Sequence, residues 1–130
     1  MINRATNPMS RHSYVSKSGR RFEFEEHRID EAPTGTNELY VFCTEGIWGF
    51  NPLYVGKAQN LRDRLQNHER LDDAKKKGAT KLLVHSEPDL VAAQLEDAET
   101  LLINELQPLL NVQKKFPMRG RAETNALAAQ

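Results

Sequence analysis

The sequence contains a single cysteine, Cys43, among its 130 residues. One thiol excludes an internal disulfide and any zinc site built from several cysteines, and such a composition is typical of a reducing compartment. No apolar run approaches the roughly 18 residues of a membrane-spanning helix. The polar stretch 1–21 also lacks the apolar centre of a secretory signal. We therefore expect a cytoplasmic protein with no membrane partner.

The chain also lacks a net charge, because 18 basic side chains balance 18 acidic ones. This excludes a globally basic protein, which is the simplest signature of nucleic-acid binding. The balance is uneven along the chain, since residues 82–113 contain no Lys or Arg and six acidic side chains. Residues 37–81 carry eight basic and six acidic side chains. The zero net charge does not exclude a local basic face, although charge alone favours ordinary solvated surfaces.

Alternating apolar and polar residues, bounded by turn residues, predict a set of short β-strands. Tyr14 to Phe24 is expected to form a hairpin around the turn Ser18-Gly19. Three further strands are expected at Leu39–Cys43, Leu53–Val55 and Leu82–His85, with a loop at 44–51 between the first two. The close spacing of these two predicts an antiparallel pair, and Gly56 is expected to end the second.

Three helices are predicted from capping residues and apolar spacing. The first runs from Leu61 to about His68 behind the N-cap Asn60, and the second covers 71–77 and is closed by Gly78. The third starts near Ser86, Pro88 and Asp89 and stops at Pro108.

This order predicts an α+β fold with a small mixed or antiparallel three-stranded sheet flanked by helices. We expect an N-terminal hairpin extension at 1–36, the main domain at 37–112, and a basic, partly flexible tail at 113–130.

Polar residues with chemical potential surround one strand–helix junction. Tyr54-Val55-Gly56-Lys57 leads into the helix that carries Arg64, and His68 follows one helical turn later, on the same expected face. Tyr40 lies in the paired strand. Glu99 lies on the edge of an apolar helical stripe, where an acid is costly to bury without a cation or a metal.

This set resembles the GIY-YIG nuclease family, and especially the incision nucleases of bacterial excision repair. The second half of the family name matches Tyr54-Val55-Gly56, and Asn60-Leu61, Arg64-Leu65, Glu99 and Asn111 follow in family order. The resemblance extends over about residues 39–111. The first half reads Glu38-Leu39-Tyr40, so its glycine is replaced by a glutamate. We expect this change to alter the entry to the strand and to leave activity intact.

The resemblance implies a metal-dependent endonuclease that hydrolyses DNA phosphodiester bonds with one divalent metal ion, Mg²⁺ or else Mn²⁺. Glu99 would hold the metal, and Arg64 would bind the non-bridging phosphate oxygens. Tyr40 would act as general base with Tyr54 as its hydrogen-bonded companion, or the two tyrosines would exchange these roles. Lys57 or the metal would favour the phenolate, because a tyrosine pKa near 10 is otherwise too high.

Other positions have supporting roles in this interpretation. His68 would contact phosphate or relay a proton, Gly56 is a turn residue, and Asn111 is a structural hydrogen-bonding residue. Nucleic-acid contacts are expected from basic residues of the helices and tail, namely Arg62, Lys75, Lys76, Lys77, Lys114, Lys115, Arg119 and Arg121. Trp48 and Phe50 could stack on bases, although packing within their loop is the simpler interpretation. A partner protein could supply targeting.

Two other function classes remain open. A binding module of the same fold could have lost turnover, and only Glu38 favours this. A protein-interaction domain is suggested only by the acidic stretch and the neutral charge.

Overall fold

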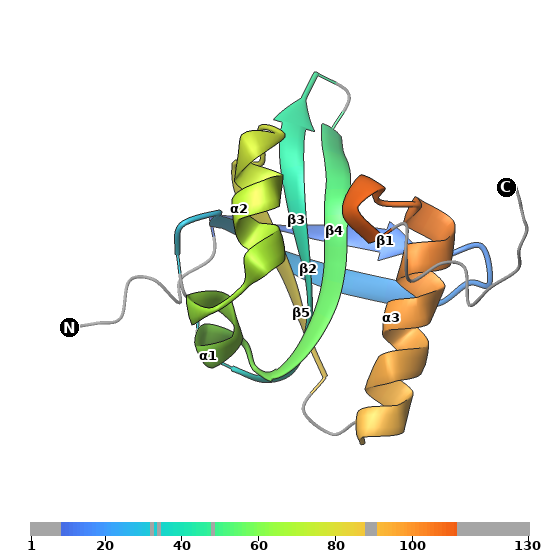
Figure 1. Cartoon of the computed structure of the whole chain (residues 1–130). Coiled ribbons are helices and arrows are strands. Elements are labelled where there is room, and N and C mark those ends of the chain that lie inside the picture. Colours follow the sequence, from blue (N-terminus) through green and yellow to red (C-terminus); the bar gives the residue numbers. More distant parts are fainter. Residues whose placement is uncertain (1–8, 32, 34, 48, 88–90, 112–130) are drawn as a thin grey trace, which may run out of the picture.

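The computed structural model describes residues 9–31, 33, 35–47, 49–87 and 91–111. One five-stranded antiparallel sheet, with the strand order β1-β2-β5-β3-β4, forms its centre (Figure 1). The elements are β1 (Ser10–Val15), β2 (Arg21–Arg28), β3 (Thr36–Gly46), β4 (Gly49–Asn60), α1 (Leu61–Gln66), α2 (Glu69–Lys76), β5 (Lys81–Ser86), α3 (Ala92–Leu106) and the 3₁₀ helix η2 (Leu109–Asn111). None of these helices is long and apolar enough to cross a membrane.

The α+β class is confirmed, but the expected three-stranded sheet is wrong, because the N-terminal hairpin joins the same sheet. The hairpin itself forms as predicted, with Gly19 at a φ of +93° in its turn. Its second strand, β2, pairs with β5 and places Glu25 opposite Val84. Alternation within a segment predicts a hairpin, but it does not predict which further strand the hairpin pairs with. Without β2, strand β5 would have an unpaired edge on that side.

The β3–β4 hairpin is longer than the sequence suggests. Its pairing continues to Gly46 and Gly49, so most of the expected loop at 44–51 is regular strand. At its other end β4 continues through Gly56 to Asn60, so the prediction that Gly56 ends the strand is wrong. Residues 44–46 extend beyond the last β3–β5 pair, Cys43 with Lys81, and pair only with β4.

The first two helices differ from the prediction at their junction. Asn60 is the N-cap of α1 as expected, and its Oδ1 accepts the Asp63 N–H at 3.1 Å. However, α1 ends at Gln66, and His68 is the N-cap of α2. His68 and Arg64 therefore do not share one helix face. Since the His68 ring satisfies an N–H of the new helix, a histidine can replace the usual Ser, Asp or Asn at this position.

The third helix begins later than expected. Its N-cap is Val91, while Ser86 still belongs to β5, and Pro88 and Asp89 lie outside the described residues. The predicted stop at Pro108 is confirmed, because Gln107 takes a left-handed conformation at the helix end. A residue before proline avoids the right-handed helical region, so the chain turns away here.

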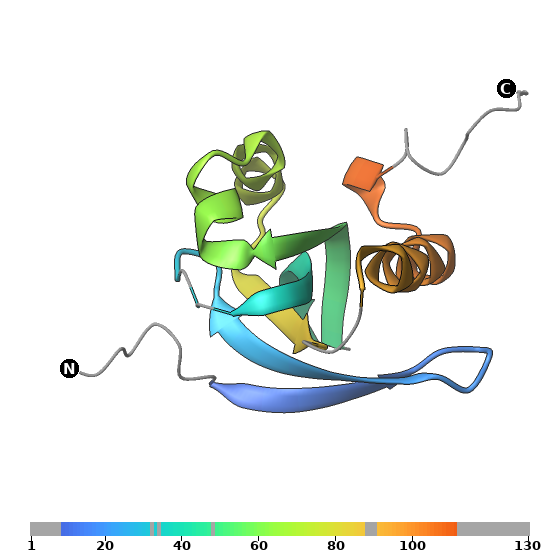
Figure 2. The same ribbon diagram turned by 90° about the horizontal axis from the view of Figure 1, so that it is seen from below.

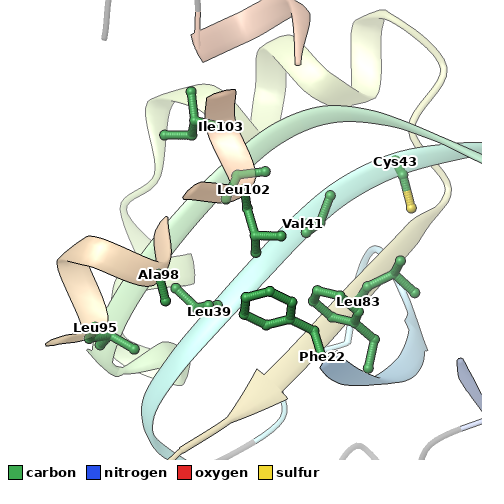
Figure 3. Packing of buried hydrophobic residues seen from close by; sticks show 11 residues of the cluster. Phe22, Leu39, Val41, Cys43, Leu83, Leu95, Ala98, Leu102 and Ile103 are labelled. Atoms are coloured by element: carbon green, nitrogen blue, oxygen red, sulfur yellow. The ribbon is translucent and has the colours of Figure 1, made fainter. Parts of the chain in front are cut away.

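The two faces of the sheet carry different elements (Figure 2). Odd-numbered β3 residues such as Leu39 and Val41 pack with Phe22 and with Ala98 and Leu102 of α3 (Figure 3). Even-numbered residues such as Tyr40 and Phe42 face a second cluster that contains buried residues of α1 and α2. We call these the α3 face and the α1/α2 face.

Asn111 fastens the chain after α3 to the edge strand β4. Its Oδ1 accepts the Val55 N–H at 2.7 Å, and its Nδ2 donates to the Val55 carbonyl at 2.9 Å. The side chain is only 1% exposed. The structural role predicted for Asn111 agrees with this geometry, because one amide satisfies both outward groups of an edge residue.

Candidate functional site

The candidate site is centred on the Tyr40 hydroxyl, which lies over Gly56 in the neighbouring strand. The two residues face each other in the β3–β4 register. A β-carbon at position 56 would lie 2.5 Å from both Cζ and the hydroxyl oxygen of Tyr40, and 2.9 Å from a ring carbon of Tyr54. No side chain fits there. Glycine is therefore required by close approach of the tyrosine in mid-strand, and not by a turn.

His68 is the hydrogen-bond partner of Tyr40. The ring Nε2 lies 2.7 Å from the Tyr40 hydroxyl oxygen, while Nδ1 accepts the Arg70 backbone N–H at 3.1 Å. An Nδ1 that accepts a hydrogen bond carries no proton, so the neutral ring has its proton on Nε2. His68 therefore donates to the Tyr40 oxygen. We expected Tyr54 to be the bonded companion of Tyr40, whereas this bond goes to His68.

Burial favours the neutral form of both partners. Desolvation raises the pKa of Tyr40 well above its ordinary value, and electrostatic interaction with Tyr54 and Glu99 raises it further, whereas Arg64 lowers it. The pKa of His68 falls to about 4, first through burial and then through the Arg64 charge. At neutral pH the pair is thus an uncharged imidazole that donates to a protonated phenol.

Arg64 lies beside this pair and lowers the pKa of Tyr40 through its charge and through a side-chain hydrogen bond. It is in the last turn of α1 and its Nη1 donates to the Asn67 carbonyl at 3.0 Å. Its side chain is partly exposed, and its charge affects both Tyr40 and His68. A guanidinium in this position can receive an anion from solvent while stabilising negative charge on the phenol oxygen.

Glu99 acts on the same tyrosine from α3. It follows Leu95 by one helical turn, is 4% exposed, and acts on the Tyr40 hydroxyl through its charge. Among the residues that the structure describes, no three His, Cys, Asp or Glu side chains are grouped closely enough to enclose a metal. One hard carboxylate beside a hydroxyl suits a Mg²⁺ ion that keeps most of its water, because Mg²⁺ dehydrates reluctantly.

Tyr54 completes an aromatic group at the site. Its ring centre lies 6.2 Å from that of Tyr40 and 5.2 Å from that of His68, and it stacks on Phe42 at 5.7 Å. Tyr54 is less buried than Tyr40. Of the two tyrosines, Tyr54 is therefore the more accessible to solvent, and Tyr40 the better positioned by hydrogen bonding.

Lys57 does not join the group around Tyr40 as the sequence suggested. Strand alternation places it with Val55 on the α3 face, opposite to Tyr54 and Gly56. There it borders a hollow of about 190 Å³ together with Asn37 and Ala92. The positive charge that acts on Tyr40 belongs instead to Arg64.

Glu38, which replaces the family glycine, is buried and turned away from solvent. One oxygen accepts the Ser86 hydroxyl at 2.6 Å, and the other, Oε1, has no hydrogen-bond partner. Desolvation raises the pKa of Glu38, an effect that the Ser86 bond partly opposes. The negative charge at this position is thus reduced, because burial favours the neutral acid.

The predicted basic contacts divide into two groups. Arg62, Lys75, Lys76 and Lys77 are exposed on α1 and at the end of α2, whereas Lys114, Lys115, Arg119 and Arg121 lie outside the described residues. Phe50 packs edge-on against His12 at 4.9 Å, which agrees with the packing interpretation, and Trp48 is not described.

The chain that carries the group Tyr40, Tyr54, Arg64, His68 and Glu99 has no match among known proteins. No family model, curated protein or solved structure matches this chain. The geometry of the site and the sequence motifs are therefore the basis for a functional proposal.

Sequence reasoning missed several polar residues that the fold buries or pairs. His27 is fully buried and its two nitrogens lie 3.5 Å from Glu25 and 3.4 Å from Glu31, beyond good hydrogen-bond geometry. Glu105 accepts bonds from the Tyr14 hydroxyl at 2.5 Å and from the Lys17 N–H, which fastens the hairpin to α3. The available signal was weak, because each is an ordinary polar residue until the β2–β5 pairing is known.

Proposed function

We propose that this protein is a metal-dependent endonuclease that hydrolyses DNA phosphodiester bonds with a tyrosine as general base. The observation that carries the proposal is the convergence on the Tyr40 hydroxyl. A histidine donates to it, and a guanidinium and a carboxylate act on it from two different helices. Strand tyrosines usually pack against apolar neighbours, and such a polar surround is costly without a chemical role.

Tyr40 is the base in this proposal. Its oxygen receives the His68 N–H, which stabilises the phenolate form that takes a proton from the attacking water. Burial opposes this step by raising the Tyr40 pKa. Arg64 and a bound cation would have to offset that effect. The phenolate is therefore expected only when substrate and metal are present.

Arg64 and Glu99 carry the other two roles. The partly exposed guanidinium would bind non-bridging phosphate oxygens through its planar fork. Glu99 would hold one Mg²⁺ or Mn²⁺, which supplies charge stabilisation for the phosphate and for the departing 3′ oxygen. His68 holds Tyr40 in place, because its Nδ1 is occupied by Arg70 and is not available for a relayed proton.

The test is nicking of supercoiled plasmid by purified protein in the presence of Mg²⁺. Glu99→Gln keeps the shape of the side chain and should lower the rate by about 10²-fold or more. Arg64→Ala should lower it similarly. Glu96→Gln, an exposed residue of the same helix, is the matched control and should cleave normally.

A non-cleaving binding module is the second candidate, and the raised pKa of Tyr40 is the observation that favours it. Salt-dependent DNA binding without nicking would establish this alternative. Nicking that persists unchanged in Glu99→Gln would show that the activity does not come from this site.

A further inference from the structure

The β3–β4 ribbon ends in an exposed aliphatic side chain. Ile47 is 92% exposed, the most of any large apolar side chain among the described residues. Single exposed apolar residues are common on protein surfaces. This one, however, follows directly after the last strand pair, Gly46 with Gly49, and the ribbon beneath it extends beyond β5. A regular ribbon therefore holds the side chain away from the body of the protein.

A basic segment lies at the base of this ribbon. Lys75, Lys76 and Lys77 end helix α2, and all three are exposed, with no ion pair to any residue described in the structure. The chain then returns to the ribbon, since the Thr80 N–H donates to the Cys43 carbonyl at 3.1 Å. Among the described ribbon residues beyond β5, 44–47 and 49–51, Glu45 is the only acidic one, and it lies 3.7 Å from the Lys81 ammonium group, which offsets its charge.

Helix α2 connects this region to the candidate site. His68 caps its first turn, and its eight residues extend about 12 Å at 1.5 Å per residue. In Figure 1, α2 runs beside β3 toward the β3–β4 turn. Along β3, the six steps from Tyr40 to Gly46 correspond to about 20 Å, which is the length of roughly six nucleotides of a DNA strand.

We infer that the β3–β4 ribbon is a wedge that inserts Ile47 at a junction between paired and unpaired DNA, while Lys75, Lys76 and Lys77 bind the adjacent phosphates. Apolar side chains that enter a base step unstack it, and the cost is smallest where bases are already unpaired. The exposed lysines require an anionic occupant, and the proposed function of the neighbouring site identifies that occupant as DNA. This inference rests on the proposed function. It assigns forked or bubble-containing DNA as the substrate class of the nuclease, with the cut roughly six nucleotides from the junction.

The experiment measures binding in EDTA, so that no cleavage occurs. The probes are a forked oligonucleotide with 2-aminopurine at the junction and a fully paired duplex of the same length. The full-length protein should raise the 2-aminopurine fluorescence of the fork and prefer it to the duplex by roughly fivefold or more, in line with the strength of base stacking. Ile47→Ser should remove the fluorescence increase and the preference.

Matched variants separate the two components of the proposed surface. Val15→Ser changes a 52% exposed apolar residue on β1 and should behave as the unchanged protein. The triple variant of Lys75, Lys76 and Lys77 to Gln should lower the slope of log binding constant against log salt by about 2–3 and keep the fork preference. Arg11→Gln, on β1, should leave the slope unchanged.

The outcomes distinguish this inference from the proposed function. An unchanged fork preference in Ile47→Ser, or an equal loss in Val15→Ser, would overturn the wedge even if Mg²⁺-dependent nicking is observed. A fluorescence increase that depends on Ile47 would support the wedge even if no nicking occurs, and in that case the nuclease proposal fails alone. Absence of salt-dependent DNA binding would overturn both.

Discussion

The two faces of the sheet bury similar amounts of the chain with very different chemistry. The α3 face is a cluster of aliphatic and aromatic side chains around Phe22, Val41 and Leu102. The α1/α2 face also buries apolar residues, but it includes Tyr40 and His68 in contact with each other, and Glu38 with an unpartnered oxygen. Such polar burial costs stability that apolar packing would not. The comparison indicates that the apolar packing of the first face maintains the fold, while the second, together with Glu99 from α3, accepts a cost for chemistry.

The largest expected effect comes from removing one oxygen on the α1/α2 face. Tyr40→Phe keeps the ring and should lower the plasmid-nicking rate by about 10²- to 10⁴-fold, the usual contribution of a general base. The free energy of unfolding should fall by only about 1–2 kcal/mol, because the His68 N–H loses its acceptor. Both are measured on the same preparation, by nicking and by urea unfolding. A normal rate in this variant would assign the base to another group.

The next largest effect is expected on the α3 face, where a substitution should lower stability and leave activity nearly unchanged. Leu102→Ala removes a fully buried side chain beneath α3 and should lower the free energy of unfolding by about 2–5 kcal/mol. The rate per folded molecule at low temperature should change little compared with Tyr40→Phe. A loss of activity as large as that of Tyr40→Phe would show that the two faces are not separable.

Acid should weaken the α1/α2 face through His68. Its pKa is 6.5 in a model peptide and about 4 in the folded protein, so the unfolded chain binds the proton first as the pH falls. This contribution is complete above pH 6.5 and is lost as the pH falls toward 4, with a size of up to about 3 kcal/mol. Urea unfolding across this range should show a smaller decline in His68→Gln. Parallel curves for the two proteins would contradict the buried neutral histidine.

The smallest expected effect tests the close approach between β3 and β4. Gly56→Ala places a methyl group against the Tyr40 hydroxyl and should lower the free energy of unfolding by about 1–3 kcal/mol. Gly46→Ala is the matched control in the same hairpin, because its β-carbon would meet nothing closer than 3.7 Å. Thermal unfolding of the two variants gives the comparison. Equal melting temperatures would mean that Tyr40 can move aside without cost.

Local patterns predicted the elements of this fold better than their extents and partners. Asn60 capped α1 and Asn111 proved structural, because each role follows from a few neighbouring residues. The β2–β5 pairing could not be predicted, since it depends on residues that are far apart in the sequence. For the same reason the sequence placed Gly56 in a turn, whereas its role depends on the opposite strand.

The sequence indicated which residues form the candidate site better than it indicated how these residues contact one another. The motif order singled out Tyr40, Arg64 and Glu99, and the charges of Arg64 and Glu99 both act on Tyr40. His68 was placed in the wrong helix, because the break at Asn67 is decided by a ring nitrogen that caps α2. Lys57 was assigned to the site by motif order, and strand alternation places it on the other face.

The amide of Asn111 also has a consequence for contacts between molecules. β4 is an outer strand of the sheet, and its unpaired backbone groups could accept a strand from another chain. At Val55 both of these groups are already occupied by Asn111. A second molecule would have to displace η2 before it could extend the sheet from this edge. The side chain that secures the end of the fold therefore also protects the edge nearest the candidate site against self-association.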